Sequence, residues 1–166
     1  EINEFIVHIR GGDCWGHNGY GGGDCFPWQP ILPISFYKNI LKDENEILFV
    51  VEKKDDPIVL KLLEHYKDSN KNIKVQSKDF LTDFKTLLQA KKIALSVSTF
   101  SWWGAFLSDA EKIIVPGGGC FNKKTERQDL NWQLNWDNVI YYEFSHKIYL
   151  DKWKGDKNDL EYVLNN

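Results

Sequence analysis

The chain has 166 residues, of which 42% are hydrophobic and 27% are charged, and its formal net charge is −3. This length and composition are typical of one globular domain with a sizeable core, and the slightly acidic balance disfavours a polyanionic partner such as nucleic acid. No apolar run reaches the roughly 20 residues that a membrane-spanning helix needs, and we expect no signal peptide. Because the sequence lacks methionine and begins almost directly with a strand pattern, we expect upstream sequence to be missing.

Strand and helix patterns alternate along the chain. Apolar residues predict a first strand at 4–10, and Pro33 suits the first turn of a helix at 33–42. Between them lies a long glycine-rich loop at 11–32, whose aromatic residues argue against simple disorder. Later patterns predict, in chain order, a strand at 46–52, a helix at 55–66 capped by Asp56, a strand at 72–76, a helix at 79–90, a strand at 92–98, a helix at 99–109, strands at 112–117 and 138–144, and a helical turn at 159–164.

This alternation indicates an α/β fold, a Rossmann-like parallel sheet with helices on both faces, formed by residues 1–166 as a single domain. The helix at 79–90 carries an apolar stripe that we expect to be buried, formed by Phe80, Leu81, Phe84, Leu87 and Leu88. In open sheets of this kind ligands bind outside the carboxyl ends of the strands. Residues that follow a strand directly are therefore the first candidates for a site.

The segment VHIRGGD at 7–13 ends the first strand in polar residues. Arg10 and Asp13 leave the carboxyl end of this strand, where a ligand is expected, and Gly11 and Gly12 allow the backbone to come close to it. An arginine at this edge is suited to phosphate, because its guanidinium group stays charged and offers several donors.

The segment SVSTFSWWGAFL at 96–107 predicts a helix that starts at the same edge of the sheet. A helix N-terminus has unpaired backbone N–H groups and binds phosphate well, and hydroxyl groups from Ser98, Thr99 and Ser101 can add to them. The simpler alternative is that Ser98 or Thr99 only caps the helix. Together with Arg10, this helix start predicts a diphosphate site. A nucleotide-dependent oxidoreductase is disfavoured, because GYGGGD at 19–24 does not match the dinucleotide glycine fingerprint.

The three cysteines, at 14, 25 and 120, leave several interpretations open. We favour three free thiols in a reducing compartment, because the number is small and odd. Cys14 and Cys25 flank the glycine-rich loop and could instead form a disulfide. A zinc site from Cys14, His17 and Cys25 is the least favoured alternative, because it lacks standard ligand spacing and a clear fourth ligand.

The order and spacing of five segments resemble those of the alpha-1,2-fucosyltransferases, family 11 of the glycosyltransferases. The segments are VHIRGGD, LPISFYKNIL, ILFVVEKKDDP, DFKTLLQAKKIALSVSTFSWWGAFL and KIIVP, and they span roughly residues 5–116. The resemblance implies a GT-B-like architecture in which this chain is the C-terminal, donor-binding half. It also implies GDP-fucose as the donor, a galactoside-type glycan as the acceptor, inversion at the anomeric carbon, and no metal or other cofactor. The acceptor-side region would be largely N-terminal and outside this chain.

The resemblance also assigns roles by position. Arg10 matches the arginine that holds the diphosphate and offsets charge on the leaving GDP, and His8 would support it or contact the nucleotide. Asp13 matches the acid of the motif; with Asp24 it is a candidate general base for an inverting transfer, and Arg10 and Asp13 are the expected catalytic residues. Asp83 lies where related fucosyltransferases place an acid near the guanine or ribose. The phosphates and nucleoside would be held by Ser98, Thr99, Phe100 and Ser101.

Two positions depart from the family pattern His-x-Arg-Arg-Gly-Asp-Tyr, because Gly11 replaces the second arginine and Cys14 replaces the tyrosine. Losing a charge-assisted contact to a phosphate costs about 1.5–3 kcal/mol. A transferase that uses another nucleotide sugar, and a non-catalytic nucleotide-sugar or carbohydrate-binding domain, are therefore kept as alternatives. The segment EKKDD at 52–56 is interpreted as a solvated turn, although it lies on the same edge of the sheet as Arg10.

Overall fold

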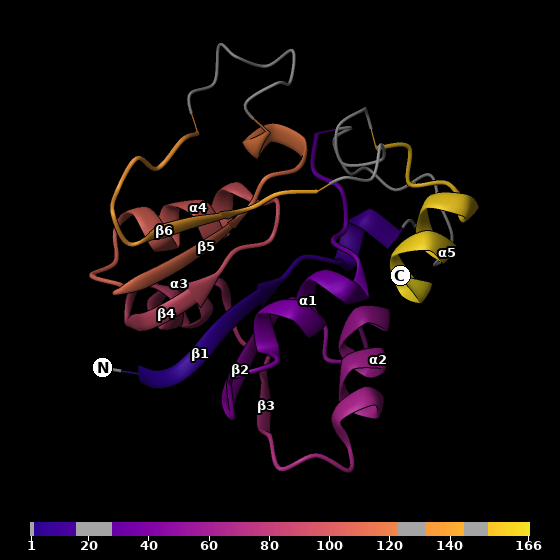
Figure 1. Cartoon of the computed structure of the whole chain (residues 1–166), viewed down its shortest axis with the longest axis horizontal. Coiled ribbons are helices and arrows are strands. Elements are labelled where there is room, and N and C mark those ends of the chain that lie inside the picture. The colour runs from indigo at the N-terminus through magenta and orange to yellow at the C-terminus, as the bar shows by residue number, and fades with distance from the viewer. Residues whose placement is uncertain (1, 16–27, 123–131, 145–152) are drawn as a thin grey trace.

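A computed structural model describes residues 2–15, 28–122, 132–144 and 153–166. In this part of the chain six parallel strands form one sheet in the order β3-β2-β1-β4-β5-β6 (Figure 1). The elements are β1 (Ile2–Ile9), a 3₁₀ turn (Gly12–Trp15), α1 (Ile34–Leu41), β2 (Glu46–Val51), α2 (Pro57–Tyr66), β3 (Asn72–Gln76), α3 (Phe80–Leu88), β4 (Ala90–Ala94), α4 (Thr99–Phe106), β5 (Lys112–Pro116), a second 3₁₀ turn (Gly119–Phe121), β6 (Val139–Tyr142) and α5 (Lys157–Asn165).

The predicted α/β class and the parallel sheet are confirmed. Helices α1 and α2 cover one face of the sheet, and α3 and α4 cover the other (Figure 1). The central strand β1 is buried from Phe5 to Ile9, as expected for a strand covered on both faces. The fourth strand is shorter than predicted, because a tight turn in which the Ser98 N–H donates to the Ser96 carbonyl (2.8 Å) ends the extended run.

The buried face of α3 differs from the predicted apolar stripe. Phe80 and Leu81 are 66% and 65% exposed, and the buried residues of the helix are Asp83, Thr86 and Leu87. The prediction was wrong for these two residues of the first turn, whereas Leu87 is buried as expected. The ring centroids of Phe80 and Phe100 in α4 lie 5.1 Å apart, so the first turn contacts the neighbouring helix without being covered by it. The Phe80 ring instead stacks on Phe84 of the same helix, with centroids 6.0 Å apart and planes 3° from parallel.

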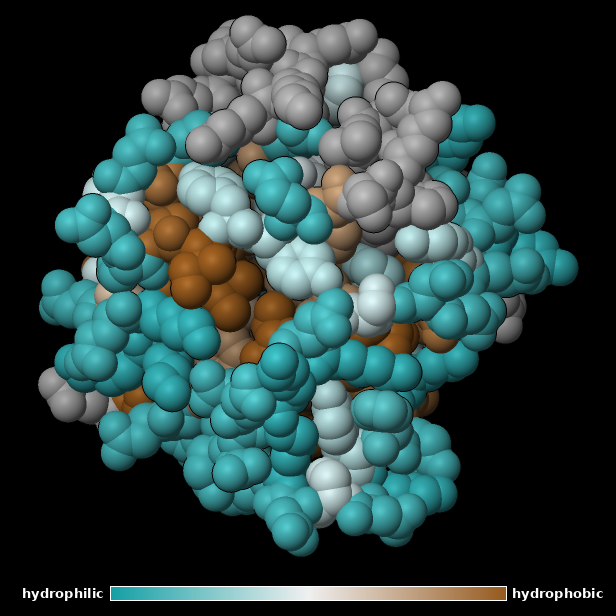
Figure 2. Space-filling model, in the orientation of Figure 1, coloured by the Kyte–Doolittle hydropathy of each residue, from teal (hydrophilic) through white to brown (hydrophobic). Residues whose placement is uncertain are grey.

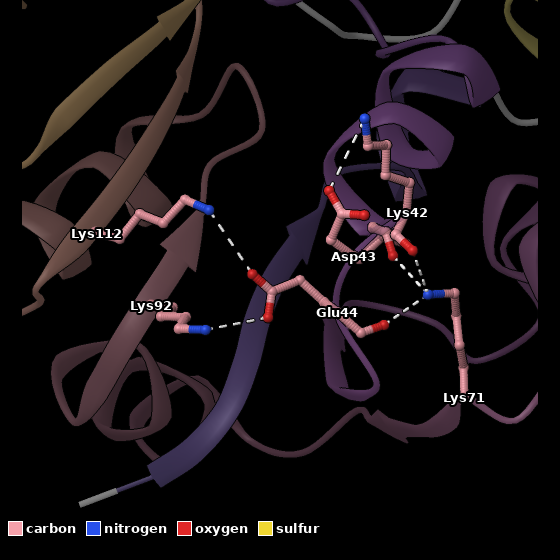
Figure 3. A network of polar contacts seen from close by, with 7 residues as sticks. Lys42, Asp43, Glu44, Lys71, Lys92 and Lys112 are labelled. Atoms are coloured by element: carbon pink, nitrogen blue, oxygen red, sulfur yellow. Dashed lines mark hydrogen bonds and ion pairs between the residues drawn. The ribbon is translucent and has the colours of Figure 1, made fainter.

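A network of charged groups joins α1 to the amino-terminal edge of the sheet (Figure 3). The Lys71 ammonium group donates to the backbone carbonyls of Leu41, Lys42 and Glu44 at 2.8, 3.0 and 2.7 Å, and so binds acceptors at the end of α1 and in the turn that follows it. The Glu44 carboxylate reaches the other way, to the ammonium groups of Lys92 (3.2 Å) and Lys112 (3.7 Å). Glu44 therefore links the turn between α1 and β2 to strands β4 and β5.

We expect Lys71→Met to lower the free energy of unfolding by about 1–2 kcal/mol, because the change keeps the aliphatic stem but removes three charge-assisted hydrogen bonds. The matched control is Lys67→Met, which removes only an exposed ion pair to Glu64 and should cost less than about 0.5 kcal/mol. Urea unfolding of both variants measures the difference. Equal losses would show that Lys71 does not act as a helix cap.

The face of the molecule seen in Figure 2 is mostly hydrophilic, with a hydrophobic area over the β5–β6 side of the sheet. Ile140 of β6 is among the exposed apolar side chains of the protein. None of the helices in the described ranges is both long enough and apolar enough to span a membrane.

Candidate functional site

A cavity of about 390 Å³ opens at the carboxyl edge of the sheet. It lies where the ends of β1 and β2 meet the starts of α3 and α4. Charged, polar and aromatic side chains reach it from all four places: His8 and Arg10 from β1, Glu52 from β2, Lys78, Phe80 and Asp83 from the start of α3, and Ser98 and Phe100 from the start of α4.

The strand order explains why a cavity forms at this point. The order reverses between β1 and β4, so the chain leaves β1 towards α1 on one face and leaves β4 towards α4 on the other. The two connections diverge, and open α/β sheets bind their ligands in the resulting crevice. The sequence prediction of a ligand site at the end of the first strand thus coincides with the switch point of the sheet.

His8 is a neutral residue of the cavity wall. Its Nδ1 atom lies 2.6 Å from the Ser96 hydroxyl oxygen, and its ring centroid lies 5.4 Å from that of Phe100. Burial, with a smaller contribution from the positive charge of Arg10, lowers the pKa of the imidazole to about 3. The ring is therefore uncharged at neutral pH, and its place beside Arg10 suits a supporting role rather than proton transfer.

We expect acid to destabilise the wild type more than a His8→Gln variant. The imidazole pKa is about 3 in the folded chain against 6.5 ordinarily, so between these values the unfolded state binds the extra proton. The free energy of unfolding then decreases by up to about 1.4 kcal/mol for each unit by which the pH is lowered. Between pH 7 and pH 5 the loss from this residue is about 2 kcal/mol.

Urea unfolding at the two pH values, compared between proteins, isolates this contribution because the carboxyl groups titrate in both. A His65→Gln variant, altered at an exposed histidine of α2, serves as the control and should lose as much stability in acid as the wild type does. An equal acid loss in the wild type and His8→Gln would contradict the expected contribution.

Arg10 lies at the cavity wall with its side chain directed along the 3₁₀ turn. Its Nε group donates to the Sγ atom of Cys14 at 3.2 Å, and Cys14 is disulfide-bonded. The prediction of three free thiols is therefore wrong for Cys14, and the zinc alternative fails because a disulfide sulfur provides no thiolate ligand. Spacing alone does not distinguish a thiol from a disulfide, because the partner must be brought near by the fold.

The third cysteine and the other predicted residues of the glycine-rich loop are only partly described. Cys120 is a free, buried thiol, and burial raises its pKa to about 12. Asp13 lies in the 3₁₀ turn that follows Arg10, where the structure describes its backbone alone. His17, Asp24 and Cys25 lie outside the described residues.

The start of α4 divides the predicted hydroxyl groups between two positions. Ser98 occupies the N-cap, but its side chain makes no capping hydrogen bond and lines the cavity, unlike a serine that only caps its helix. Ser101 is fully buried and donates to the carbonyls of Ser96 (3.3 Å) and Ser98 (3.1 Å), which closes the turn from strand to helix. Thr99 is exposed and is not part of the cavity wall. Phe100 joins Ser98 in the wall.

Asp83 lines the cavity, and both of its carboxylate oxygens accept hydrogen bonds from other residues of the chain. Its Oδ1 atom accepts from the Gln76 Nε2 group at 2.8 Å, and its Oδ2 atom accepts from the Lys78 backbone N–H at 3.1 Å. These bonds hold the connection from β3 to α3. The fold therefore gathers five of the predicted site residues, His8, Arg10, Asp83, Ser98 and Phe100, and leaves Thr99 and Ser101 outside the wall.

Three charged or aromatic residues of the cavity wall, Glu52, Lys78 and Phe80, were not predicted as site residues. Glu52 was interpreted as part of a solvated turn, and its side chain is exposed as expected but also lines the cavity. Phe80 was interpreted as part of a buried stripe. The signal that could have found Glu52 is its position, because it directly follows β2 at the edge where Arg10 follows β1.

Gly11, where the family pattern expected from the sequence has a second arginine, packs where no side chain fits. The Trp15 indole Nε1 group donates to the Asp56 carboxylate at 2.7 Å, and a Cβ atom built on Gly11 would overlap that carboxylate. Asp56 is buried and also caps α2, with its Oδ1 atom accepting from the Ile58 N–H at 2.9 Å. Burial raises the pKa of this carboxyl group, although the Trp15 hydrogen bond lowers it in part. A glycine at position 11 therefore leaves free the space that the Asp56 carboxylate occupies.

The fold and the cavity define an open α/β domain of the Rossmann-like kind, with its ligand site at the switch point of the sheet. The family model of glycosyl transferase family 11 matches residues 39–140, and the chain belongs to this family. It is thus a member of a class of enzymes that transfer sugars, as the resemblance indicated. Neither the curated proteins nor the solved structures provided a match.

Proposed function

We propose that the chain transfers L-fucose from GDP-fucose to a galactoside-type glycan with inversion at the anomeric carbon. Membership of glycosyl transferase family 11 supports the transferase class. The observation that carries the proposal is that Arg10 and Ser98 line one cavity. Ser98 lies at the start of α4, and its hydroxyl makes no capping hydrogen bond there. A cation and a helix N-terminus together provide the donors that a diphosphate needs.

The proposed reaction places developing negative charge in this cavity. An acceptor hydroxyl attacks the anomeric carbon of the donor, the bond from that carbon to the diphosphate oxygen breaks, and GDP leaves with the bonding electrons. Arg10 and the N–H groups at the start of α4 offset the charge that builds on the diphosphate, which is electrostatic stabilisation by groups already in place. The proton of the acceptor passes to a base, for which Asp13 and Asp24 are the candidates.

His8 takes no proton in this scheme, because the pKa of its buried imidazole is held at about 3. Its contact with Ser96 keeps the ring at the base of the cavity, beside Phe100. We assign it to shaping the wall against which the donor lies.

The second candidate function is a transferase that uses another nucleotide sugar. The packing around Gly11 supports this candidate. Because no side chain fits at this position, a second arginine contact to the phosphates is absent there. A donor site with one motif arginine is compatible with a different leaving nucleotide or sugar.

Calorimetric titration of the whole chain with GDP, GDP-fucose, GDP-mannose and UDP-galactose, without added metal, tests the proposal. We expect both GDP and GDP-fucose to bind, with UDP-galactose at least tenfold weaker. Release of GDP from GDP-fucose in the presence of lactose then tests transfer. A folded chain that prefers UDP-galactose would support the second candidate, binding of GDP-fucose without transfer would support a non-catalytic binding domain, and no binding of any nucleotide would overturn the donor site.

A further inference from the structure

We propose that Glu52 binds the ribose hydroxyl groups of the donor nucleotide. This inference rests on the proposed function and goes further, because it names the nucleotide subsite next to the diphosphate. Glu52 directly follows β2, which pairs in parallel with β1, and its side chain lines the cavity that Arg10 and Ser98 line.

The backbone of the 3₁₀ turn makes room for this carboxylate. Gly12 has a φ angle of +51°, a conformation that residues with side chains rarely adopt, and a Cβ atom built on it would overlap the Glu52 carboxylate. The carboxylate therefore lies directly against the turn that carries the chain away from Arg10. Among the residues that the structure describes, its oxygens make no hydrogen bond or ion pair with another side chain, so they can accept hydrogen bonds from a ligand.

Charge excludes one role for Glu52 and favours another. A carboxylate repels a phosphate, so Glu52 does not extend the diphosphate site. The two vicinal hydroxyl groups of a ribose are donors, and a carboxylate has two oxygens with which to accept from them. Hydrogen bonds with one charged partner are about twice as strong as neutral ones, and the exposed Glu52 side chain is accessible to a ligand in the cavity.

The order of the strands agrees with the order of groups in a nucleotide. Proceeding across the edge of the sheet, Ser98 follows β4, Arg10 follows β1, Glu52 follows β2, and Lys78 follows β3. Neighbouring strands lie about 4.8 Å apart, so the carboxylate is displaced by one strand from the arginine, as a ribose is displaced from its phosphate. In dinucleotide-binding sheets with this strand order an acidic residue contacts the ribose in the same way.

Nucleotides that lack one hydroxyl group test the inference. GDP, 2′-deoxy-GDP and 3′-deoxy-GDP are titrated into the whole chain and into Glu52→Ala and Glu52→Gln variants. We expect the wild type to bind at least one deoxy analogue about tenfold more weakly than GDP. In Glu52→Ala, GDP should bind about tenfold more weakly than in the wild type, and the difference between GDP and its analogues should vanish. Glu52→Gln should be intermediate, because its amide oxygen still accepts.

The matched control is Asp55→Ala, which removes an exposed carboxylate from the same turn without changing the cavity wall. It should bind all three nucleotides as the wild type does. The inference is overturned if Glu52→Ala binds GDP unchanged or more tightly, or if it keeps the full preference for GDP over both analogues. In those cases GDP binding by the wild type would still support the proposed donor site. A folded wild type that binds no GDP overturns both proposals.

Discussion

Replacing Arg10 with alanine will weaken the binding of GDP by about 10- to 150-fold, the equivalent of about 1.5–3 kcal/mol for hydrogen bonds between charged groups. The reason is that Arg10 is the motif cation at the cavity wall, beside the start of α4. We expect transfer to fall by a larger factor than binding, because negative charge on the diphosphate increases as the bond to the sugar breaks. Calorimetry with GDP and a GDP-release assay measure the two effects separately.

Two further variants make the result specific. Arg10→Lys keeps the charge but loses the planar guanidinium group, which can donate two hydrogen bonds to one phosphate. It should therefore bind GDP more tightly than Arg10→Ala but more weakly than the wild type. Lys53→Ala removes an exposed cation from the turn after β2, outside the cavity wall, and should leave binding unchanged. Thermal unfolding confirms that each variant is folded. GDP affinity within threefold of the wild type in a folded Arg10→Ala protein would show that the diphosphate lies elsewhere.

Introducing at position 11 the second arginine of the expected family pattern, by Gly11→Arg, will destabilise the protein by about 3 kcal/mol rather than improve its donor binding. The new side chain would enter the space of the Asp56 carboxylate and disturb its hydrogen bond from Trp15. Since Asp56 also caps α2, the disturbance reaches the start of that helix. Urea unfolding measures the loss, and titration with GDP shows whether the additional charge has any benefit.

A double-mutant cycle identifies the cause of this loss. Gly11→Ala introduces only a Cβ atom, and it should destabilise the wild type by about 1–3 kcal/mol. In an Asp56→Ala background the obstructing carboxylate is gone, so the same change should cost clearly less, and the cycle subtracts the lost helix cap. Equal costs in both backgrounds, or a Gly11→Arg protein of normal stability that binds GDP more tightly, would contradict the packing argument.

Much of the architecture could be predicted because its signals are local. Strand and helix patterns alternate along the chain, and β3 and the cap of α2 at Asp56 agree with prediction. The carboxyl edge of the sheet was also identified in advance, since Arg10 follows a strand and Ser98 precedes a helix. The family resemblance was confirmed by the family match.

Other properties depend on residues that are distant in sequence. The pattern of α3 suggested five buried apolar positions, but Phe80 faces the cavity and Asp83 is buried with hydrogen-bond partners on another strand and its following loop. Periodicity predicts a hydrophobic face and does not show which part of that face another element covers. In the same way, the states of Cys14 and Cys120 depend on proximity that spacing does not encode.

The amino-acid sequence alone determined the α/β class, the family and the strand ends at which a site should form, because these follow from patterns within short segments. Which side chains meet at these strand ends depends on the tertiary structure. It separated Ser98, which lines the cavity, from Ser101, whose hydroxyl closes a turn, and it brought Glu52 to the same wall as Arg10. It also showed that Gly11 packs against Asp56, 45 positions further along the sequence. The order of strands in the sheet brings these residues together, and no local pattern records that order.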